Sequence, residues 1–132
     1  MSLTSEVFLV RADGGIDILA GPDDGRDDGL DLAGPESWRT KVWGSQAIRR
    51  IGARFFPALV SVDNADVVAP DEIPAFLREI ALVRAHVTQL ATETCSPDRT
   101  VEDHADHISR RLDCIEASTR YAQRRGGGLL IW

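Results

Sequence analysis

The chain has 132 residues, of which 43% are hydrophobic and 27% are charged, and its formal net charge is −6. This length and composition are typical of a soluble globular protein, so we expect a single domain over residues 1–132. No apolar run approaches the roughly 20 residues of a membrane-spanning helix. The first residues also lack the basic and apolar regions of a signal peptide. These features predict a cytoplasmic protein without a membrane partner.

The negative charge is concentrated near the N-terminus. Residues 1–34 contain eight acidic residues and two arginines, whereas the remaining chain contains thirteen acidic and thirteen basic residues. An acidic chain without a basic block lacks the side chains that neutralise phosphates, which supply much of the affinity in nucleic-acid binding. The charge distribution therefore argues against nucleic acid as a partner.

The first predicted element is a β-hairpin within "EVFLVRADGGIDILAG", residues 6–21. Residues 6–11 are rich in β-forming side chains, Gly14 and Gly15 suit a tight turn, and residues 16–19 alternate apolar with polar side chains. An acidic segment follows at about residues 21–36. We expect it to be a mobile loop, because its glycines, prolines and aspartates are typical of turns and almost none of its side chains could enter a core.

The acidic segment fits a calcium loop, a docking surface for a basic partner, or a solvated connection. With Gly29 at position 6 of an EF-hand loop, Arg26 and Pro35 fall at positions 3 and 12, where ligands are needed, so that pattern fails. Irregular calcium binding through clustered oxygens, a solvated loop and a docking surface stay open. The docking hypothesis rests on five aspartates: Asp23, Asp24, Asp27, Asp28 and Asp31.

Trp38 and Trp43 follow the acidic segment directly. Two indole rings in this position could form an aromatic anchor of a binding surface, or both could fill the core, since each buries a large area.

A helical apolar pattern then covers residues 45–56, with Ser45 as N-cap and Pro57 limiting its extension. Residues 58–62 and 66–68 fit either short strands or an extended connection.

Two longer helices are predicted at residues 71–94 and 100–125. Apolar side chains recur at three- and four-residue steps in both, and the segment "TCSPDRT" between them breaks the pattern. Thr100 and Asp103 form a variant of the capping box at the start of the second helix, and Gly126 ends it. We expect the two helices to pack antiparallel.

The antiparallel arrangement of the two helices keeps the two cysteines too far apart for a disulfide. In an antiparallel pair Cys95 lies at the turn, whereas Cys114 lies about 20 Å along the second helix, at roughly 1.5 Å per residue. A disulfide needs Cα atoms within about 7 Å of each other. We therefore expect two free, reduced thiols, and two cysteines alone form no zinc-binding pattern.

The chain closes with a short apolar strand at Leu129–Trp132. A single terminal strand is unstable in water, so it must pair with the N-terminal hairpin. The predicted fold class is α+β. A small antiparallel or mixed sheet of the hairpin and the C-terminal strand packs against an antiparallel helix pair and a shorter third helix.

The segment "EDHADHISRR" at residues 102–111 is the cluster most similar to a metal or catalytic site. On a helix Asp103, His104 and His107 are neighbours, and they could begin a zinc or iron site. Against this, the sequence shows no further convergent ligand, and His104 could be a half-buried, hydrogen-bonded side chain. No nucleophile elbow and no phosphate-binding glycine loop is present. We therefore expect no catalytic residues, no cofactor and no enzyme activity.

The segments "SQAIRRIGARFFPAL", "DEIPAFLREIALVRAH" and "IEASTRYAQRRGGGLLIW" resemble small bacterial proteins, some of which look like toxin-neutralising immunity proteins. The resemblance covers most of the chain from residue 45 onward and includes no diagnostic motif. It favours a non-catalytic interaction module, immunity-like, that binds a basic protein partner through its acidic N-terminal surface. The alternative hypothesis is a small metal-binding protein or metal-dependent enzyme centred on His104 and His107.

Overall fold

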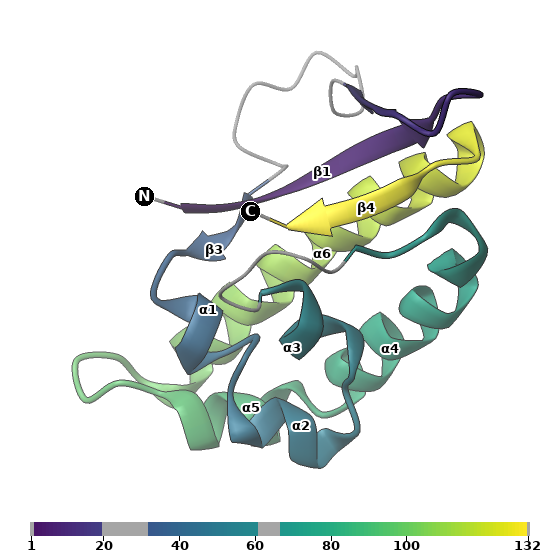
Figure 1. Cartoon of the computed structure of the whole chain (residues 1–132). Helices are drawn as coiled ribbons and strands as arrows, with labels where there is room; N and C mark the ends of the chain where they lie inside the picture. Colours follow the sequence, from purple (N-terminus) through teal and green to yellow (C-terminus); the bar gives the residue numbers. More distant parts are fainter. Residues whose placement is uncertain (1, 20–31, 61–66, 132) are drawn as a thin grey trace.

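A four-stranded antiparallel sheet packed against helices forms the architecture of the computed structural model (Figure 1). The structure describes residues 2–19, 32–60 and 67–131. The predicted α+β class is confirmed. The strands are β1 (Ser2–Val10), β2 (Ile16–Leu19), β3 (Leu32–Pro35) and β4 (Gly128–Ile131).

Strand β1 holds the sheet together, because it pairs antiparallel with each of the other three strands. Val7 pairs with Leu19 of β2 and also with Leu129 of β4, so β2 and β4 lie on opposite edges of β1. The expected pairing between the hairpin and the C-terminal strand is therefore confirmed. The strand runs from Gly128 to Ile131, and Trp132 lies outside the described residues.

Strand β3 falls in the segment that the sequence predicts to be a loop, and this is a correction. Its sequence is LAGP, and it pairs with Ser2, Leu3 and Thr4 through an irregular register. Glycine and proline are depleted in strands, so the local sequence does not favour this structure. The strand forms because its neighbour β1 supplies the hydrogen-bonding edge.

The longest helix lies across one face of the sheet. This helix, α6 (Val101–Arg125), packs against β1, β3 and β4, and its outer side meets α4 and α5 (Figure 1). None of the helices in the described ranges is long and apolar enough to cross a bilayer. The other helical elements are α1 (Trp38–Lys41), α2 (Gln46–Ile51), α3 (Phe55–Leu59), η1 (Pro70–Glu72), α4 (Ile73–Ala85) and α5 (Val87–Thr94).

Two predicted helices are interrupted. The helix at 71–94 begins as the short η1 and breaks at His86, whose ring nitrogen Nδ1 lies 2.9 Å from the Leu82 carbonyl oxygen. The helix at 45–56 ends at Gly52, which has φ 116°, and a new short helix starts at Phe55. A side chain that bonds the local backbone and a left-handed glycine are both ordinary causes of such breaks.

The start of the region after Pro57 differs from both expected forms, since it is neither a strand nor an extended connection. Residues up to Leu59 belong to α3 rather than to a strand. Residues 61–66 lie outside the described part of the chain. Val68 makes an isolated antiparallel bridge to Leu129, so the extended segment at 66–68 is partly confirmed.

The predicted caps by Ser45 and Thr100 are confirmed, the latter as the Thr100 half of the predicted capping box. The Ser45 hydroxyl accepts a hydrogen bond from the Ile48 N–H, and the Thr100 hydroxyl accepts one from the Asp103 N–H. Gly126 ends α6 in the left-handed conformation with φ 69°. Cys95 follows α5 and Cys114 is buried in α6, and no disulfide joins these two described cysteines.

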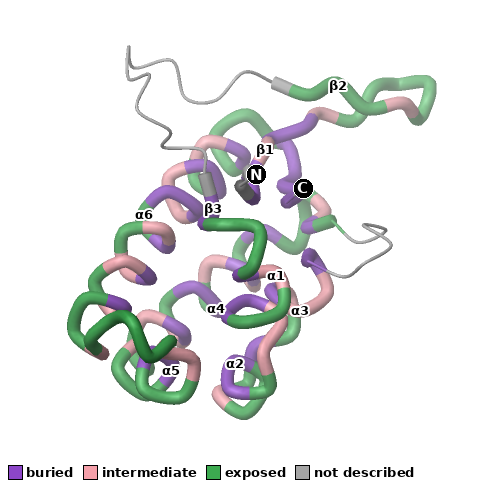
Figure 2. The backbone as a smooth tube through the Cα atoms, turned by 90° about the vertical axis from the view of Figure 1, so that its left-hand side faces the viewer, coloured by how far each residue is buried: buried purple, intermediate pink, exposed green. Residues whose placement is uncertain are grey.

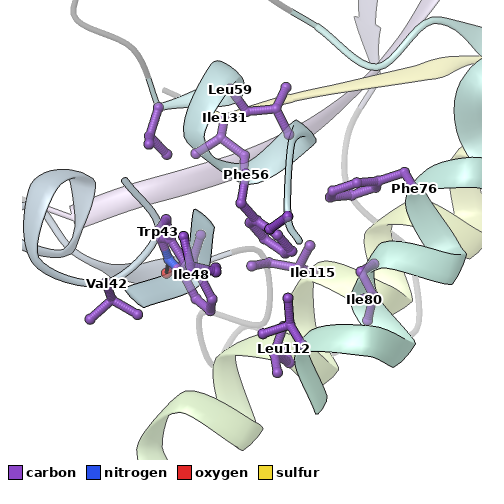
Figure 3. Packing of buried hydrophobic residues seen from close by; sticks show 14 of the residues in the cluster. Val42, Trp43, Ile48, Phe56, Leu59, Phe76, Ile80, Leu112, Ile115 and Ile131 are labelled. Carbon is purple, nitrogen blue, oxygen red and sulfur yellow. Dashed lines mark hydrogen bonds between the residues drawn. The ribbon is translucent and has the colours of Figure 1, made fainter. Parts of the chain in front are cut away.

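An aromatic stack forms the centre of the core between the sheet and the helices (Figure 3). The ring of Trp43 stacks on Phe56 with centroids 4.8 Å apart, and Phe56 lies 5.2 Å from the ring of Phe76. The Trp43 indole N–H donates a 2.7 Å hydrogen bond to the Ala33 carbonyl oxygen in β3. The indole nitrogen of this fully buried ring thus has a hydrogen-bond partner, and the same bond links β3 to the core.

Candidate functional site

The five aspartates of the docking hypothesis lie outside the described residues, since the structure describes nothing between residues 19 and 32. Their role as a docking surface stays a prediction. The structure does describe the hairpin from which they follow in sequence, and that hairpin carries the first candidate surface.

Three aliphatic side chains are exposed on one face of the hairpin. Val10 lies opposite Ile16, and Ile18 lies opposite Phe8, so all four share a face. Phe8 is buried, whereas the exposed fractions of Val10, Ile16 and Ile18 are 56%, 48% and 45%. The hairpin projects beyond the body of the molecule, and its tip is mostly exposed (Figure 2). We call Val10, Ile16 and Ile18 the hairpin patch.

The structure places both candidate anchor tryptophans in the core rather than on a surface. Trp43 is fully buried and Trp38 is 6% exposed. Trp38 packs over Gly34 of β3, where an added Cβ would lie 2.6 Å from the indole ring. Both tryptophan rings therefore fill the core, and neither ring is available as an exposed anchor.

The histidine pair on α6 is held against Trp38. The imidazole centroids of His104 and His107 lie 5.7 and 4.9 Å from the Trp38 ring, both in edge-on arrangements. His104 is buried, and its Nε2 lies 2.9 Å from the Thr94 hydroxyl at the end of α5. That hydroxyl already donates its proton to the Leu90 carbonyl oxygen, so it accepts from an Nε2–H of His104.

The arrangement does not extend the histidine pair into a metal site. Asp103 is exposed in the first turn of α6, and its backbone N–H donates a hydrogen bond to the Thr100 hydroxyl. In the described part of the chain, no group of three or more histidine, cysteine or acidic side chains is placed to hold a metal ion. A metal site needs three or four convergent ligands. The sequence identified the two histidines correctly as neighbours, but it could not show that Trp38 and Thr94 are their partners.

We expect His104 to make the free energy of unfolding depend on pH. Burial, with a smaller contribution from Arg99, lowers the pKa of His104 below its ordinary value of 6.5. The unfolded chain then binds more protons than the folded chain as the pH falls below 6.5, so acid destabilises the fold. Denaturant titrations of wild type and His104→Asn at several pH values should show a steeper decline in wild type. A difference between the two proteins that is constant from pH 5 to 8 would contradict this role.

Comparisons with protein-family models, with curated proteins and with solved structures find no match for this chain.

Proposed function

We propose that this protein is a non-catalytic interaction module that docks a basic protein partner through its N-terminal region. The observation that carries the proposal is the hairpin patch, whose three large aliphatic side chains are exposed. The backbone of the hairpin that bears it projects beyond the body of the molecule (Figure 2). Clustered exposed apolar side chains favour contact with another protein. In sequence the patch leads directly into the acidic segment, which holds most of the excess negative charge of the chain.

The two features have complementary roles in this proposal. Apolar side chains release water when a partner covers them, and this burial contributes free energy to the bound state. The aspartates add long-range attraction, which raises the rate of encounter with a basic partner. A basic protein surface is the partner in this proposal, and nucleic acid is not, because the acidic region repels phosphates.

The biological setting that we propose is that of a bacterial cytoplasmic protein of the immunity-like kind. The resemblance of the segments from residue 45 onward supports this setting. A basic toxin domain would be one partner of the required chemistry, because an acidic surface can cover and neutralise a basic one.

Replacing Asp23, Asp24, Asp27, Asp28 and Asp31 with asparagine should slow association with the partner by about tenfold or more at low ionic strength. The dependence of the association rate on salt should become weaker, since fewer charges attract the partner. The measurement is an association rate at two ionic strengths, with the partner first found by co-purification and then purified. The melting temperature should stay unchanged or rise slightly, because mutual repulsion among the aspartates does not favour folding.

Two further variants make this experiment specific. Replacing the exposed Asp71, Glu102 and Asp103 with amides serves as a control, and its effect per charge removed should be much smaller. Replacing Ile16 and Ile18 with threonine should act mainly on the dissociation rate, because contact area affects the lifetime of a complex more than the encounter. Association rates of the aspartate variant that equal those of wild type at both ionic strengths would reduce the acidic segment to a solvated connection.

A further inference from the structure

His107 lies between two guanidinium groups. The Arg99 Nη1 atom lies 2.7 Å from His107 Nδ1, and the Arg111 Nε atom lies 3.5 Å from His107 Nε2. Arg111 is one helical turn after His107 on α6, whereas Arg99 comes from the segment between α5 and α6. The two arginines therefore approach opposite nitrogens of the same ring.

The hydrogen-bond donors around the His107 ring outnumber the acceptors. One arginine N–H and one imidazole N–H are left without an acceptor. A guanidinium can only donate hydrogen bonds, and a neutral imidazole accepts at one nitrogen and donates at the other. Both arginine N–H groups point at ring nitrogens, and a neutral ring can accept from only one of them. The other arginine N–H then faces an imidazole N–H, so these two groups meet as two donors. A single oxygen atom placed beside both would accept from both.

Neither Arg99 nor Arg111 forms an ion pair with a carboxylate in the described ranges. The Asp98 carboxyl is the neighbouring negative group, and a hydrogen bond from Ser96, with a smaller contribution from the charge of Arg99, lowers the pKa of that carboxyl. Asp98 accepts a hydrogen bond from the Ser96 hydroxyl, and Asp106 pairs with Arg110.

The titration of His107 is consistent with this charge distribution. Burial lowers its pKa first, and the charges of Arg111, Arg99, Arg110 and His104 lower it further. No carboxylate acts on the ring in the opposite direction. The environment of His107 therefore has the excess positive charge that a bound anion would balance.

We propose that Arg99, His107 and Arg111 form a binding site for one phosphate-class oxyanion, either inorganic phosphate or a phosphate monoester. Two guanidiniums match the charge of a dianion, and the two guanidiniums and the imidazole offer donors for several oxygens of a tetrahedral group. Arg99 is exposed, while His107 and Arg111 are half-buried, so the group can enter from solvent. The edge contact with Trp38, at 4.9 Å between centroids, positions the imidazole ring.

The first experiment follows the histidine ring resonances of the intact chain by NMR during a titration with sodium phosphate at pH 7.5. The control is sodium chloride at equal ionic strength. Phosphate should shift the His107 signals along a saturable curve and raise the pKa of His107, because the anion stabilises the imidazolium. The exposed His86, near the end of α4, should shift no more in phosphate than in chloride. Equal shifts of His107 in phosphate and in chloride would overturn the proposal.

Substitution of the arginines tests the geometry. Arg99→Gln and Arg111→Gln should each weaken phosphate binding by about tenfold, which is the loss expected for one charge-assisted hydrogen bond. Arg78→Gln is the matched control, since Arg78 is an exposed arginine on α4, and it should leave binding unchanged. Equal losses of phosphate affinity in all three variants would show a diffuse charge effect and would contradict a specific site at Arg99, His107 and Arg111.

Competing ligands identify the source of the anion. Tighter binding of O-phosphoserine than of inorganic phosphate would assign the site to phosphorylated peptides, and tighter binding of glycerol phosphate would assign it to lipid headgroups. Tightest binding of inorganic phosphate itself would assign it to the free ion. Acetate that binds as tightly as phosphate would show a general carboxylate contact and would overturn the phosphate assignment.

Discussion

Deletion of residues 129–132 is expected to leave a chain that aggregates or lacks fixed tertiary structure. Leu129, Leu130 and Ile131 are buried in β4, and β4 occupies one edge of β1 from Ser5 to Phe8. Each buried aliphatic side chain contributes about 2 to 4 kcal/mol. Their sum is comparable with the whole free energy of unfolding of a small domain, about 5 to 15 kcal/mol. Deletion also exposes an unpaired strand edge, which favours aggregation.

Near-ultraviolet circular dichroism and thermal melting of the truncated protein are the direct measurements. Leu129→Ala gives a milder test and should cost about 3 kcal/mol, because the side chain is fully buried. Ile18→Ala, at a half-exposed position of the hairpin, is the control and should cost less than about 1 kcal/mol. A truncated chain whose melting temperature stays within about 2 °C of wild type would refute the role assigned to β4.

Glu79→Ala is expected to cost about 3 to 5 kcal/mol, a large effect for one substitution. Glu79 is buried on α4, and its carboxylate accepts hydrogen bonds from three successive backbone N–H groups at the start of α3. The Oε1 atom lies 2.7 Å from Arg54 N and 3.0 Å from Phe55 N, and the Oε2 atom lies 2.9 Å from Phe56 N. Alanine would leave these donors without an acceptor, at a helix start that also favours negative charge.

Denaturant unfolding of two companion variants would separate the causes. Glu79→Gln keeps one oxygen acceptor but presents an N–H to the third donor, so its loss should lie between those of wild type and Glu79→Ala. Glu102→Ala removes an exposed carboxylate from the first turn of α6 and should cost about 0.5 kcal/mol. A Glu79→Ala loss no larger than that of Glu102→Ala would show that the three hydrogen bonds contribute little to stability.

The parts of the fold that the sequence predicts well are those with local determinants. The two glycines of the hairpin turn, the Thr100 cap and the left-handed Gly126 act within a few residues of themselves, so their effects can be recognised without tertiary structure. The terminal strand is predictable for a different reason, since four apolar residues need a partner and the hairpin was the strongest candidate. These predictions together define the α+β class.

The parts that the sequence misses depend on tertiary contacts. Strand β3 contains Gly34 and Pro35, and it exists because β1 pairs with it and Trp38 packs on its glycine. The break at His86 is also hidden, because the apolar pattern continues from Val83 to Val87 across it. Local patterns carry no information about such contacts.

The candidate sites show the same limit. The sequence placed His104 and His107 side by side on a helix, but Trp38 and Arg99, which contact them, come from other segments. The alternating pattern of β2 indicates one apolar face, and it cannot show that the hairpin extends past the helices. For this reason the hairpin patch emerged only from the folded chain.

The position of β1 at the centre of the sheet has a consequence for the order in which the chain can fold. Its partner Leu129 lies near the opposite end of the sequence from Val7, and Ser5 likewise bonds Ser118 of α6. Contacts between such distant residues slow folding, because a long loop must close before they form. During synthesis β1 must therefore wait, with one edge incompletely paired, until residues 128–131 have left the ribosome. Chaperone protection of the nascent N-terminal strand would matter most in that interval.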